Sequence, residues 1–347
     1  MELEPNIKVI FQTLATTAIE RSERGKLCIL IDDDTNTDTW TTLEGVEDIV
    51  ADDWASENVQ LLGTAFEVFT PHTVIIRRVG TDDIGTILKD VATKKATQLC
   101  YPGVSEEDDL TIVTWAKAQV EEQGTVYIST FATNSDSCAV VELNNTSFTH
   151  QIIEDYTPSM FTVMLGGAMA GCPLNRSLDN YIMPTLTAVD NVEYAEGKLS
   201  LYNDDDQVRI VLAVNSKTEF DSTWKENTRK IKVFEGMNIV RHDIEDTFKD
   251  NWVNHYINNY NNKMAFCNVV NKTYFPSLQP NVLDSEYDNA MDISSEMNKA
   301  KIVIDGKDPD DYTDAQIKRY NTADFFYATA DVMFADTMAH LELKINY

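Results

Sequence analysis

The sequence is poor in basic residues. Its 347 residues include 28 Lys and Arg against 57 Asp and Glu, which gives a net charge of −29. Nucleic-acid binding needs clustered positive side chains, and anionic membrane surfaces attract polybasic segments. We therefore expect neither nucleic acid nor a membrane as a direct partner. The negative charge favours a solvated outer surface.

Cysteine is also scarce, and no two cysteines lie close together in the sequence. The five are Cys28, Cys100, Cys138, Cys172 and Cys267, without a CxxC pair. An odd number at wide spacing argues against a disulfide framework and a zinc site, and it fits a reducing cytosol. Each cysteine lies among apolar or small residues, so we expect buried thiols.

Long hydrophobic runs are absent as well. The longest apolar stretch, residues 160–173, is too short to span a bilayer. Glu2 and Glu4 precede any apolar run, whereas a secretory signal begins with positive charge. We therefore expect no targeting signal.

Familiar catalytic motifs are missing too. The chain has five histidines, and it contains no HExxH, no phosphate-binding GK[ST] loop and no GxSxG elbow. Cys172 is better explained as a small residue in a tight helix contact than as a nucleophile. We expect no enzyme activity and no cofactor. A triad assembled from distant residues, as in a hydrolase on an α/β scaffold, stays open as an alternative.

An acidic stretch near the N-terminus resembles a calcium loop only in part. Asp32, Asp34, Asn36 and Asp38 alternate as calcium ligands do, but Thr37 stands where the loop glycine belongs. Leu43 occupies the place of the bidentate glutamate. We therefore expect a solvated acidic loop and no metal site.

The pattern of the first half predicts alternating strands and helices. Strands are expected at 26–31, 73–79, 96–101 and 125–131, and helices at 59–66, 82–91 and 105–124. Ser105 followed by three carboxylates is a good helix start. A strand, a helix and a strand within about 35 residues form a βαβ unit, so this region predicts a parallel sheet.

Three further elements follow. A helix opening at Thr157 and Pro158 contains several small residues, whose low helix propensity predicts close packing against another backbone. Residues 203–206 predict the turn of a hairpin between strands 198–202 and 207–214. Aromatic residues recur at every fourth position of 243–262, which predicts a long helix with its stripe in the core.

Both ends of the chain carry a short alternating segment. Residues 340–347 place Leu341, Leu343 and Ile345 on one side and polar residues on the other, the pattern of a strand with one buried face. Ile7, Val9 and Phe11 alternate in the same way near the N-terminus. The two segments either complete a sheet within their own chain or enter neighbouring subunits by strand addition.

The order of several motifs resembles one family, the sheath proteins of contractile tails in phages and phage-derived bacteriocins of Gram-positive bacteria. The motifs span nearly the whole chain and are LATTAIERSERG (14–25), YPGVSEEDDLTIVTWAKAQ (101–119), MLGGAMAGCPLNRS (164–177), IEDTFKDNWVNHYINNYNNK (244–263) and ADVMFADTMAHLELKINY (330–347). The acidic run 32–57 is the main departure from the family pattern.

The resemblance implies an α/β structural protein in four parts. These are an N-terminal arm (1–26), a small β-rich domain (27–93), a subtilisin-like α/β domain without protease function (94–235) and a C-terminal domain ending in a strand arm (236–347). Arms containing Ile7, Val9, Phe11, Leu341, Leu343 and Ile345 are expected to exchange strands between subunits.

The same resemblance implies the partners. Copies of the chain form six-fold rings stacked into a helical sleeve around an inner tube, with baseplate and terminator or collar proteins at the ends. The sleeve contracts and drives the tube through a cell envelope, after assembly in the cytoplasm of a bacterial host. We expect Arg229, Lys230 and Lys232 to face the tube. A tube or baseplate component of the same machine is the other alternative.

Overall fold

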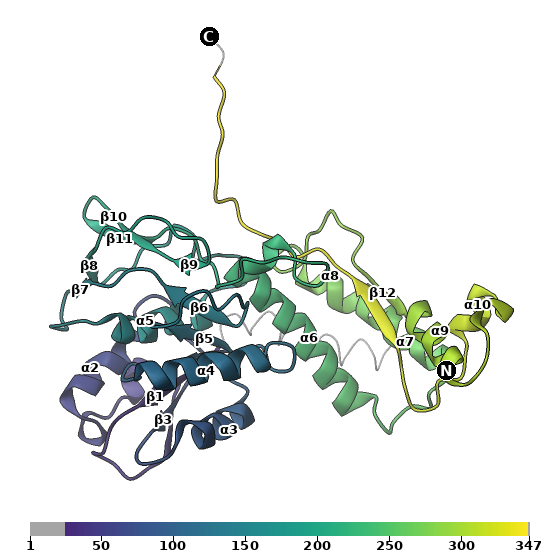
Figure 1. Cartoon of the computed structure of the whole chain (residues 1–347), viewed down its shortest axis with the longest axis horizontal. Helices are drawn as coiled ribbons and strands as arrows, with labels where there is room; N and C mark the ends of the chain where they lie inside the picture. The colour runs from purple at the N-terminus through teal and green to yellow at the C-terminus, as the bar shows by residue number, and fades with distance from the viewer. Residues whose placement is uncertain (1–24, 346–347) are drawn as a thin grey trace. The chain divides into compact units, whose positions relative to one another are not determined.

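The computed structural model describes residues 25–345, and Figure 1 shows the path of the chain. The described residues divide into two compact units. The α/β unit holds residues 25–238 and 336–345, and the C-terminal unit holds residues 239–335. We describe each unit by itself.

The α/β unit is built on a seven-stranded sheet in the order β2-β3-β1-β4-β5-β6-β9. Its strands are β1 (Lys26–Ile31), β2 (Trp40–Leu43), β3 (Thr73–Arg78), β4 (Gln98–Cys100), β5 (Val126–Ser129), β6 (Val140–Leu143) and β9 (Lys198–Leu199). All neighbouring pairs are parallel except β2 and β3. The central strands are continuous apolar runs because helices cover both faces. The predicted parallel sheet is confirmed.

Two pairs of helices cover this sheet (Figure 1). Helices α3 (Ile84–Lys94) and α4 (Glu106–Ala118) pack on one face, and α2 (Ser56–Thr64) and α5 (Pro158–Gly171) on the other. The predicted helix starts are confirmed. The Ser105 hydroxyl accepts from the Asp108 backbone N–H at 3.2 Å, and the Thr157 hydroxyl accepts from the Met160 N–H at 3.2 Å.

The small residues of α5 let it lie directly on other backbone, as the sequence predicted. A Cβ atom on Gly167 would stand 2.0 Å from the carbonyl oxygen of Ala65. A Cβ atom on Gly171 would stand 2.7 Å from the Cβ of Phe69. This close approach is what offsets the low helix propensity of glycine.

The predicted boundary between residues 93 and 94 does not divide the structure. Strand β1 pairs with β3 on one side and with β4 on the other, so residues 27–93 and 94–235 share one sheet and one core. The first of these segments also carries two helices and is not β-rich. Hydrogen bonding from β1 to both neighbours is the physical reason.

Smaller elements complete the α/β unit. They are β7 (Phe148–His150), β8 (Leu186–Val189), β10 (Leu201–Asp204) and β11 (Gln207–Ile210), with single-turn 3₁₀ helices η1 (Val46–Asp48), η2 (Ala51–Asp53) and η3 (Glu226–Arg229). Strands β10 and β11 form the predicted hairpin, in which Asp205 has φ +51° in the turn. Strands β7 and β8 pair antiparallel.

The C-terminal unit is mostly helical, with one two-stranded sheet. The division between the units falls within α6 (Ile231–Asn251), after Asn238. The other elements are α7 (Tyr260–Val269), the π-helical η4 (Val270–Tyr274), α8 (Phe275–Leu278), β12 (Ala290–Ile293), α9 (Ser295–Ile304), η5 (Pro309–Asp311), α10 (Asp314–Lys318) and β13 (Ala328–Asp331).

The helix predicted over residues 243–262 is wrong at both ends. The observed α6 begins at Ile231 and ends at Asn251, and a new helix begins at Tyr260. Asn254 adopts φ +64°, and the Asn259 side chain caps α7 by accepting from the Asn262 N–H. Asparagine tolerates the left-handed conformation and caps helices well, so the asparagines here break the aromatic periodicity.

The predicted burial of the aromatic stripe is confirmed only in part: Trp252 is buried and Phe248 is half-buried, whereas Tyr256 is 38% exposed. The ring of Phe266 lies 5.4 Å from that of Phe248 and 5.1 Å from that of Trp252. Phe326 joins them from the segment before β13, 5.8 Å from Phe266. Across residues 25–345, no helix is both long and apolar enough to cross a membrane.

Candidate functional site

The C-terminal segment that the sequence marked as a strand has no partner strand in one copy of the chain. Residues 340–345 belong to no helix or strand, and Figure 1 draws them as an extended trace. Leu341, Leu343 and Ile345 are 85%, 72% and 74% exposed. The matching N-terminal residues Ile7, Val9 and Phe11 lie outside the described residues. The segment therefore presents three apolar side chains at two-residue spacing to solvent.

The basic residues predicted to face a tube have partners within their own unit. Arg229 pairs with Glu196 and Glu226, each at 3.3 Å, and Lys230 Nζ lies 3.4 Å from Asp179 Oδ2. Lys232 Nζ donates to the carbonyl oxygen of Leu174 at 2.6 Å. Burial lowers the pKa of Lys232. The three charges thus hold local structure, and a role towards a tube stays a prediction.

The acidic stretch after β1 is organised by hydrogen bonds and by an arginine of β3. Asp33 accepts from the Ala55 N–H at 2.9 Å and from Asn58 Nδ2 at 2.7 Å. Burial by itself would raise the pKa of Asp33, but these hydrogen bonds outweigh burial and hold that pKa below its usual range. The Arg78 guanidinium lies 3.8 Å from the Trp54 ring centroid and donates to the carbonyl oxygens of the loop. Within residues 25–345, no group of three acidic, His or Cys side chains could hold a metal ion.

A buried serine and aspartate do meet, but their geometry is structural. Ser129 Oγ donates to Asp109 Oδ2 at 2.6 Å, and Tyr127 Oη donates to Oδ1 at 2.8 Å. His150 is engaged elsewhere, with Nε2 3.3 Å from Glu67 Oε2 and Nδ1 accepting backbone N–H groups. The Ser129 hydroxyl donates its proton to the Asp109 carboxylate, so this cluster links α4 to β5.

The five cysteine thiols lie in environments that lower their reactivity. Cys28, Cys100, Cys138 and Cys267 are buried and Cys172 is half-buried. Burial raises the pKa of Cys172 to about 12, so its thiol stays protonated at neutral pH and is a poor nucleophile. The predicted role of a small packing residue fits this environment.

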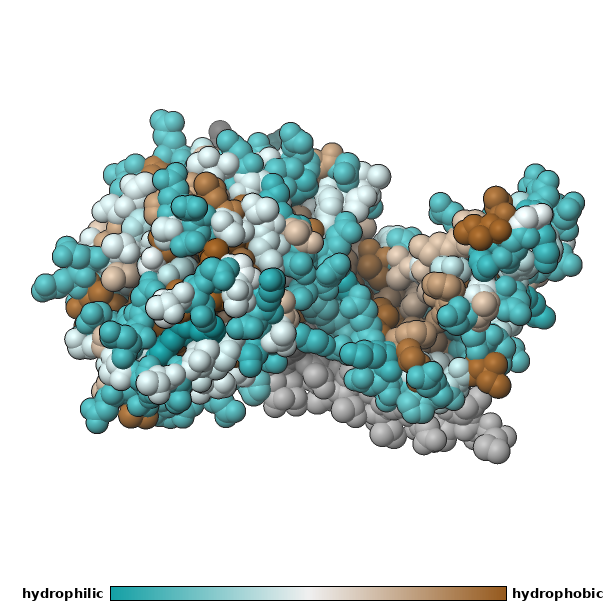
Figure 2. Space-filling model, turned by 60° about the horizontal axis from the view of Figure 1, so that its bottom comes forward, coloured by the Kyte–Doolittle hydropathy of each residue, from teal (hydrophilic) through white to brown (hydrophobic). Residues whose placement is uncertain are grey.

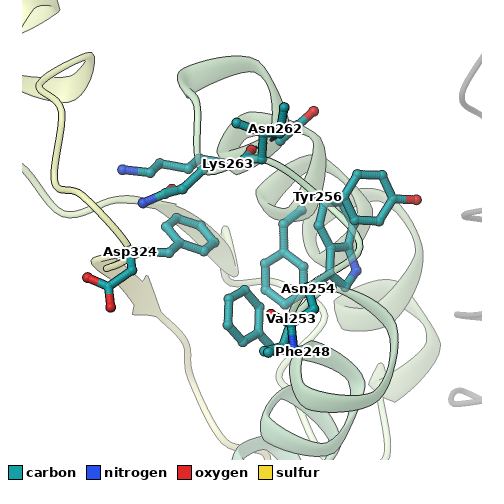
Figure 3. Close-up of a pocket in the computed structure, with 12 residues that line it drawn as sticks. Phe248, Val253, Asn254, Tyr256, Asn262, Lys263 and Asp324 are labelled. Atoms are coloured by element: carbon teal, nitrogen blue, oxygen red, sulfur yellow. Dashed lines mark hydrogen bonds between the residues drawn. The ribbon is translucent and has the colours of Figure 1, made fainter.

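An aromatic hollow lies in the C-terminal unit, with a volume of about 460 Å³. Figure 3 shows Phe248 of α6, Val253 and Tyr256 of the following turn, and Lys263 of α7 around it. Lys263 Nζ donates to Thr322 Oγ1 at 2.6 Å, and burial lowers the pKa of Lys263. Apolar side chains also reach the surface of this unit (Figure 2). They include Ile257, Met297, Val303 and Ile304.

Comparisons with known proteins find tail sheath proteins. No family model matches the chain. A tail sheath protein of Clostridium phage phiCD119 is 23% identical over 362 residues, covering 98% of each chain. A sheath tail protein from Listeria innocua has a TM-score of 0.69 at 11% identity, covering 94% of this chain and 99% of that one. The contracted helical sheath of the anti-feeding prophage has a TM-score of 0.67 at 12% identity, with 93% of each chain covered.

The chain is similar to contractile tail sheath proteins over nearly its whole length. The relationship extends over both units, since each comparison covers more than nine tenths of the chain. Its mixed α/β fold with a parallel-rich sheet is that of the solved sheath structures. Among the described residues, the exposed apolar side chains of segment 341–345 are the candidate functional site.

Two features of the structure were not predicted from the sequence. Arg78 had no visible role within an apolar strand, and Asn271 of η4 stands in a mixed apolar and polar stretch without a recognisable motif. Both act through hydrogen bonds to residues distant in sequence. For Arg78, an arginine in a predicted buried strand together with the acidic run at 32–57 was a signal of pairing. Asn271 had no local signal.

Proposed function

We propose that this chain is the structural, non-enzymatic subunit of a contractile sheath. Copies polymerise as stacked six-fold rings around an inner tube, and contraction drives the tube through the envelope of a target cell. The observation that carries the proposal is the full-length relationship to a tail sheath protein. The exposed alternating segment 341–345 supports it, because such a segment has no use in an isolated monomer.

Strand addition explains how copies are joined. A head-to-tail contact that does not close on itself produces an open helical polymer. Each backbone hydrogen bond contributes roughly 0.5–1.5 kcal/mol, so about six per arm give roughly 3–9 kcal/mol before ordering costs. Leu341, Leu343 and Ile345 fix the register, since a slip of one residue would turn them to water.

The same joints permit contraction. The seven-stranded sheet and its helices form one packed core, and such a body moves as a whole. Terminal segments that leave the body can act as hinges while their strands stay paired. Subunits then rotate as rigid bodies between an extended and a contracted state, and the mesh of exchanged strands keeps them connected.

Further partners follow from this role. An inner tube protein, baseplate proteins and a terminator or collar protein complete the particle, which assembles inside a bacterial host. We propose Arg229, Lys230 and Lys232 as the tube-facing patch. The ion pairs of Arg229 are more exposed to solvent than that of Lys230. The Arg229 side chain is partly exposed, and both of its glutamate partners are largely exposed.

Electron microscopy of the expressed chain tests the proposal. Wide, hollow, ridged sleeves are expected, and narrow smooth tubes or particles without helical order would overturn it. Replacing Leu341, Leu343 and Ile345 by serine should leave a folded monomer that does not polymerise. Replacing Glu342 and Lys344 by serine is the matched control, because these side chains lie on the other face of the same segment. Equal assembly by both variants would refute strand exchange through this segment.

A further inference from the structure

One edge of the seven-stranded sheet is open. Strand β2 is the outermost strand on that side, and its neighbour in the sheet is β3. The Arg78 N–H donates to the Thr39 carbonyl oxygen at 3.0 Å, so these two residues form a hydrogen-bonded pair. Such pairs alternate along an antiparallel ladder. The backbone groups of Thr41 therefore face β3, and those of Trp40 and Thr42 face outward.

Nothing in the described part of the chain covers these outward groups. The N–H and C=O groups of Trp40 and Thr42 have no hydrogen-bond partner within residues 25–345. Thr42 is exposed and Trp40 is half-buried. A row of unpaired backbone donors and acceptors is a template for one more strand. The β2 edge can therefore accept an extended segment.

The charge around this edge decides which segment fits. Residues 32–57 contain ten acidic residues and no basic one. Asp38 and Glu44, at the two ends of β2, are both exposed. A second copy of this chain would bring the same carboxylates against them, and carboxylates beside an edge strand discourage pairing between copies. A segment rich in Lys or Arg has the complementary charge.

The two faces of the sheet beside β2 differ. On the α3 face, Lys94 Nζ lies 4.7 Å from the centroid of the Trp40 ring. On the other face, Arg78 donates to Thr41 Oγ1 and to the carbonyl oxygen of Asp53, which places the acidic loop there. An added strand points successive side chains to opposite faces. Apolar side chains would meet the aromatic ring, and basic side chains would meet the acidic loop.

We propose that the β2 edge binds an extended basic segment of another protein, which adds to the sheet as its outermost strand with basic and apolar side chains in alternation. The backbone groups of Trp40 and Thr42 supply the hydrogen bonds. Asp38 and Glu44 select a basic segment over a second copy of this chain. The site lies within the α/β unit and does not involve residues 341–345. The inference goes beyond the proposed sheath function and is independent of it.

Peptide binding tests the proposal. The probe is a short, dye-labelled, end-capped peptide of alternating lysine and valine, titrated with the full chain by fluorescence anisotropy. Two control peptides carry N-methyl groups on all valines or on all lysines. In an added strand only one of these sets points its N–H groups at β2, so one methylated peptide should bind roughly tenfold more weakly and the other should bind like the parent. Equal affinities of the two methylated peptides, or no binding of the parent peptide, would overturn the proposal.

Proline substitutions at adjacent residues of β2 locate the site. Thr42→Pro removes an outward N–H and leaves the bonds to β3, so the melting temperature should hold while the affinity for the peptide falls roughly tenfold. Thr41→Pro removes a bond to β3 and should lower the melting temperature. An unchanged affinity in Thr42→Pro would overturn the proposal.

Charge substitutions give a second measurement that leaves the backbone intact. Asp38→Asn combined with Glu44→Gln should weaken peptide binding roughly fivefold and flatten its dependence on salt. Asp205→Asn combined with Asp206→Asn, in the turn between β10 and β11, removes the same charge and is the matched control. Equal losses in the two double variants would overturn the proposal. A chain that binds the peptide without forming sleeves would contradict the sheath function alone, and a chain that forms sleeves without binding the peptide would contradict this inference alone.

Discussion

Replacing Gly167 by alanine should destabilise the α/β unit strongly. The added Cβ would lie 2.0, 2.6 and 2.8 Å from the O, C and Cα atoms of Ala65, all of which are backbone atoms. An ordinary contact begins at 3.4 Å, so the two segments must part by about 3.4 − 2.0 = 1.4 Å. No side-chain rotation can supply that distance.

The cost follows from where α5 lies. It packs on β1, β4 and β5 at the centre of the sheet, so moving it opens gaps along its length. Overpacking of a core costs about 1–3 kcal/mol, and here the clash is with rigid backbone, so we expect the upper end, about 3 kcal/mol. Gly63→Ala is the matched control. A Cβ atom at this position in α2 meets nothing within 4 Å and should stabilise the helix by up to about 1 kcal/mol.

Urea unfolding of chains lacking residues 340–347 provides the assay, because these chains should stay monomeric. The midpoint should fall for Gly167→Ala and rise slightly for Gly63→Ala, with unchanged slopes. A Gly167→Ala chain within about 0.5 kcal/mol of the parent would refute the close-packing argument, since that is the range of neutral surface changes.

Three further outcomes are expected. Asp109→Asn puts an amide donor against two hydroxyl donors, so it should cost roughly 1–3 kcal/mol in urea unfolding; if it costs no more than the exposed control Glu107→Gln, the buried network is unimportant. Burial raises the pKa of Glu235 to about 8, so the folded chain holds this proton more tightly than the unfolded one. The free energy of unfolding should therefore fall as pH rises from about 4.5 towards 8, by at most about 1.4 kcal/mol per pH unit. In thermal melts across this range, Glu235→Gln should flatten that slope and the control Glu226→Gln should leave it unchanged. A slope that survives Glu235→Gln would contradict the assignment to Glu235. Leu343→Pro removes an N–H from a segment unpaired in one copy, so sedimentation should show lost assembly at an unchanged melting temperature, whereas equal losses would indicate an internal strand.

Local patterns predicted much of the α/β unit because the causes are local there. The cap at Ser105 and the cap and small residues of α5 depend on a few neighbouring residues, and each is confirmed. The boundary at residue 93 failed for the opposite reason. Which strands lie beside β1 is decided by pairing across about 70 residues, and composition does not reveal it.

The break after α6 shows two local signals in conflict. Aromatic residues at every fourth position predicted one helix through residue 262, and asparagines at 251, 254, 258 and 259 favoured an interruption. Aromatic side chains can be buried without belonging to one continuous helix. Phe266 and Phe326 come from later in the chain and pack against Phe248 and Trp252, so these two side chains stay covered although the helix ends at Asn251.

The terminal segment marks the limit of what one copy of the sequence can specify. An alternating pattern fixes which side chains of residues 341–345 share a face, but a strand also needs an edge to pair with. In the described chain, residues 341–345 have no such edge within their own copy. Subunits carrying a net charge of −29 repel one another at long range. Backbone hydrogen bonds are uncharged and form only at contact, at an unpaired strand edge. They are therefore well suited to join copies in one register, while the long-range repulsion keeps free subunits apart.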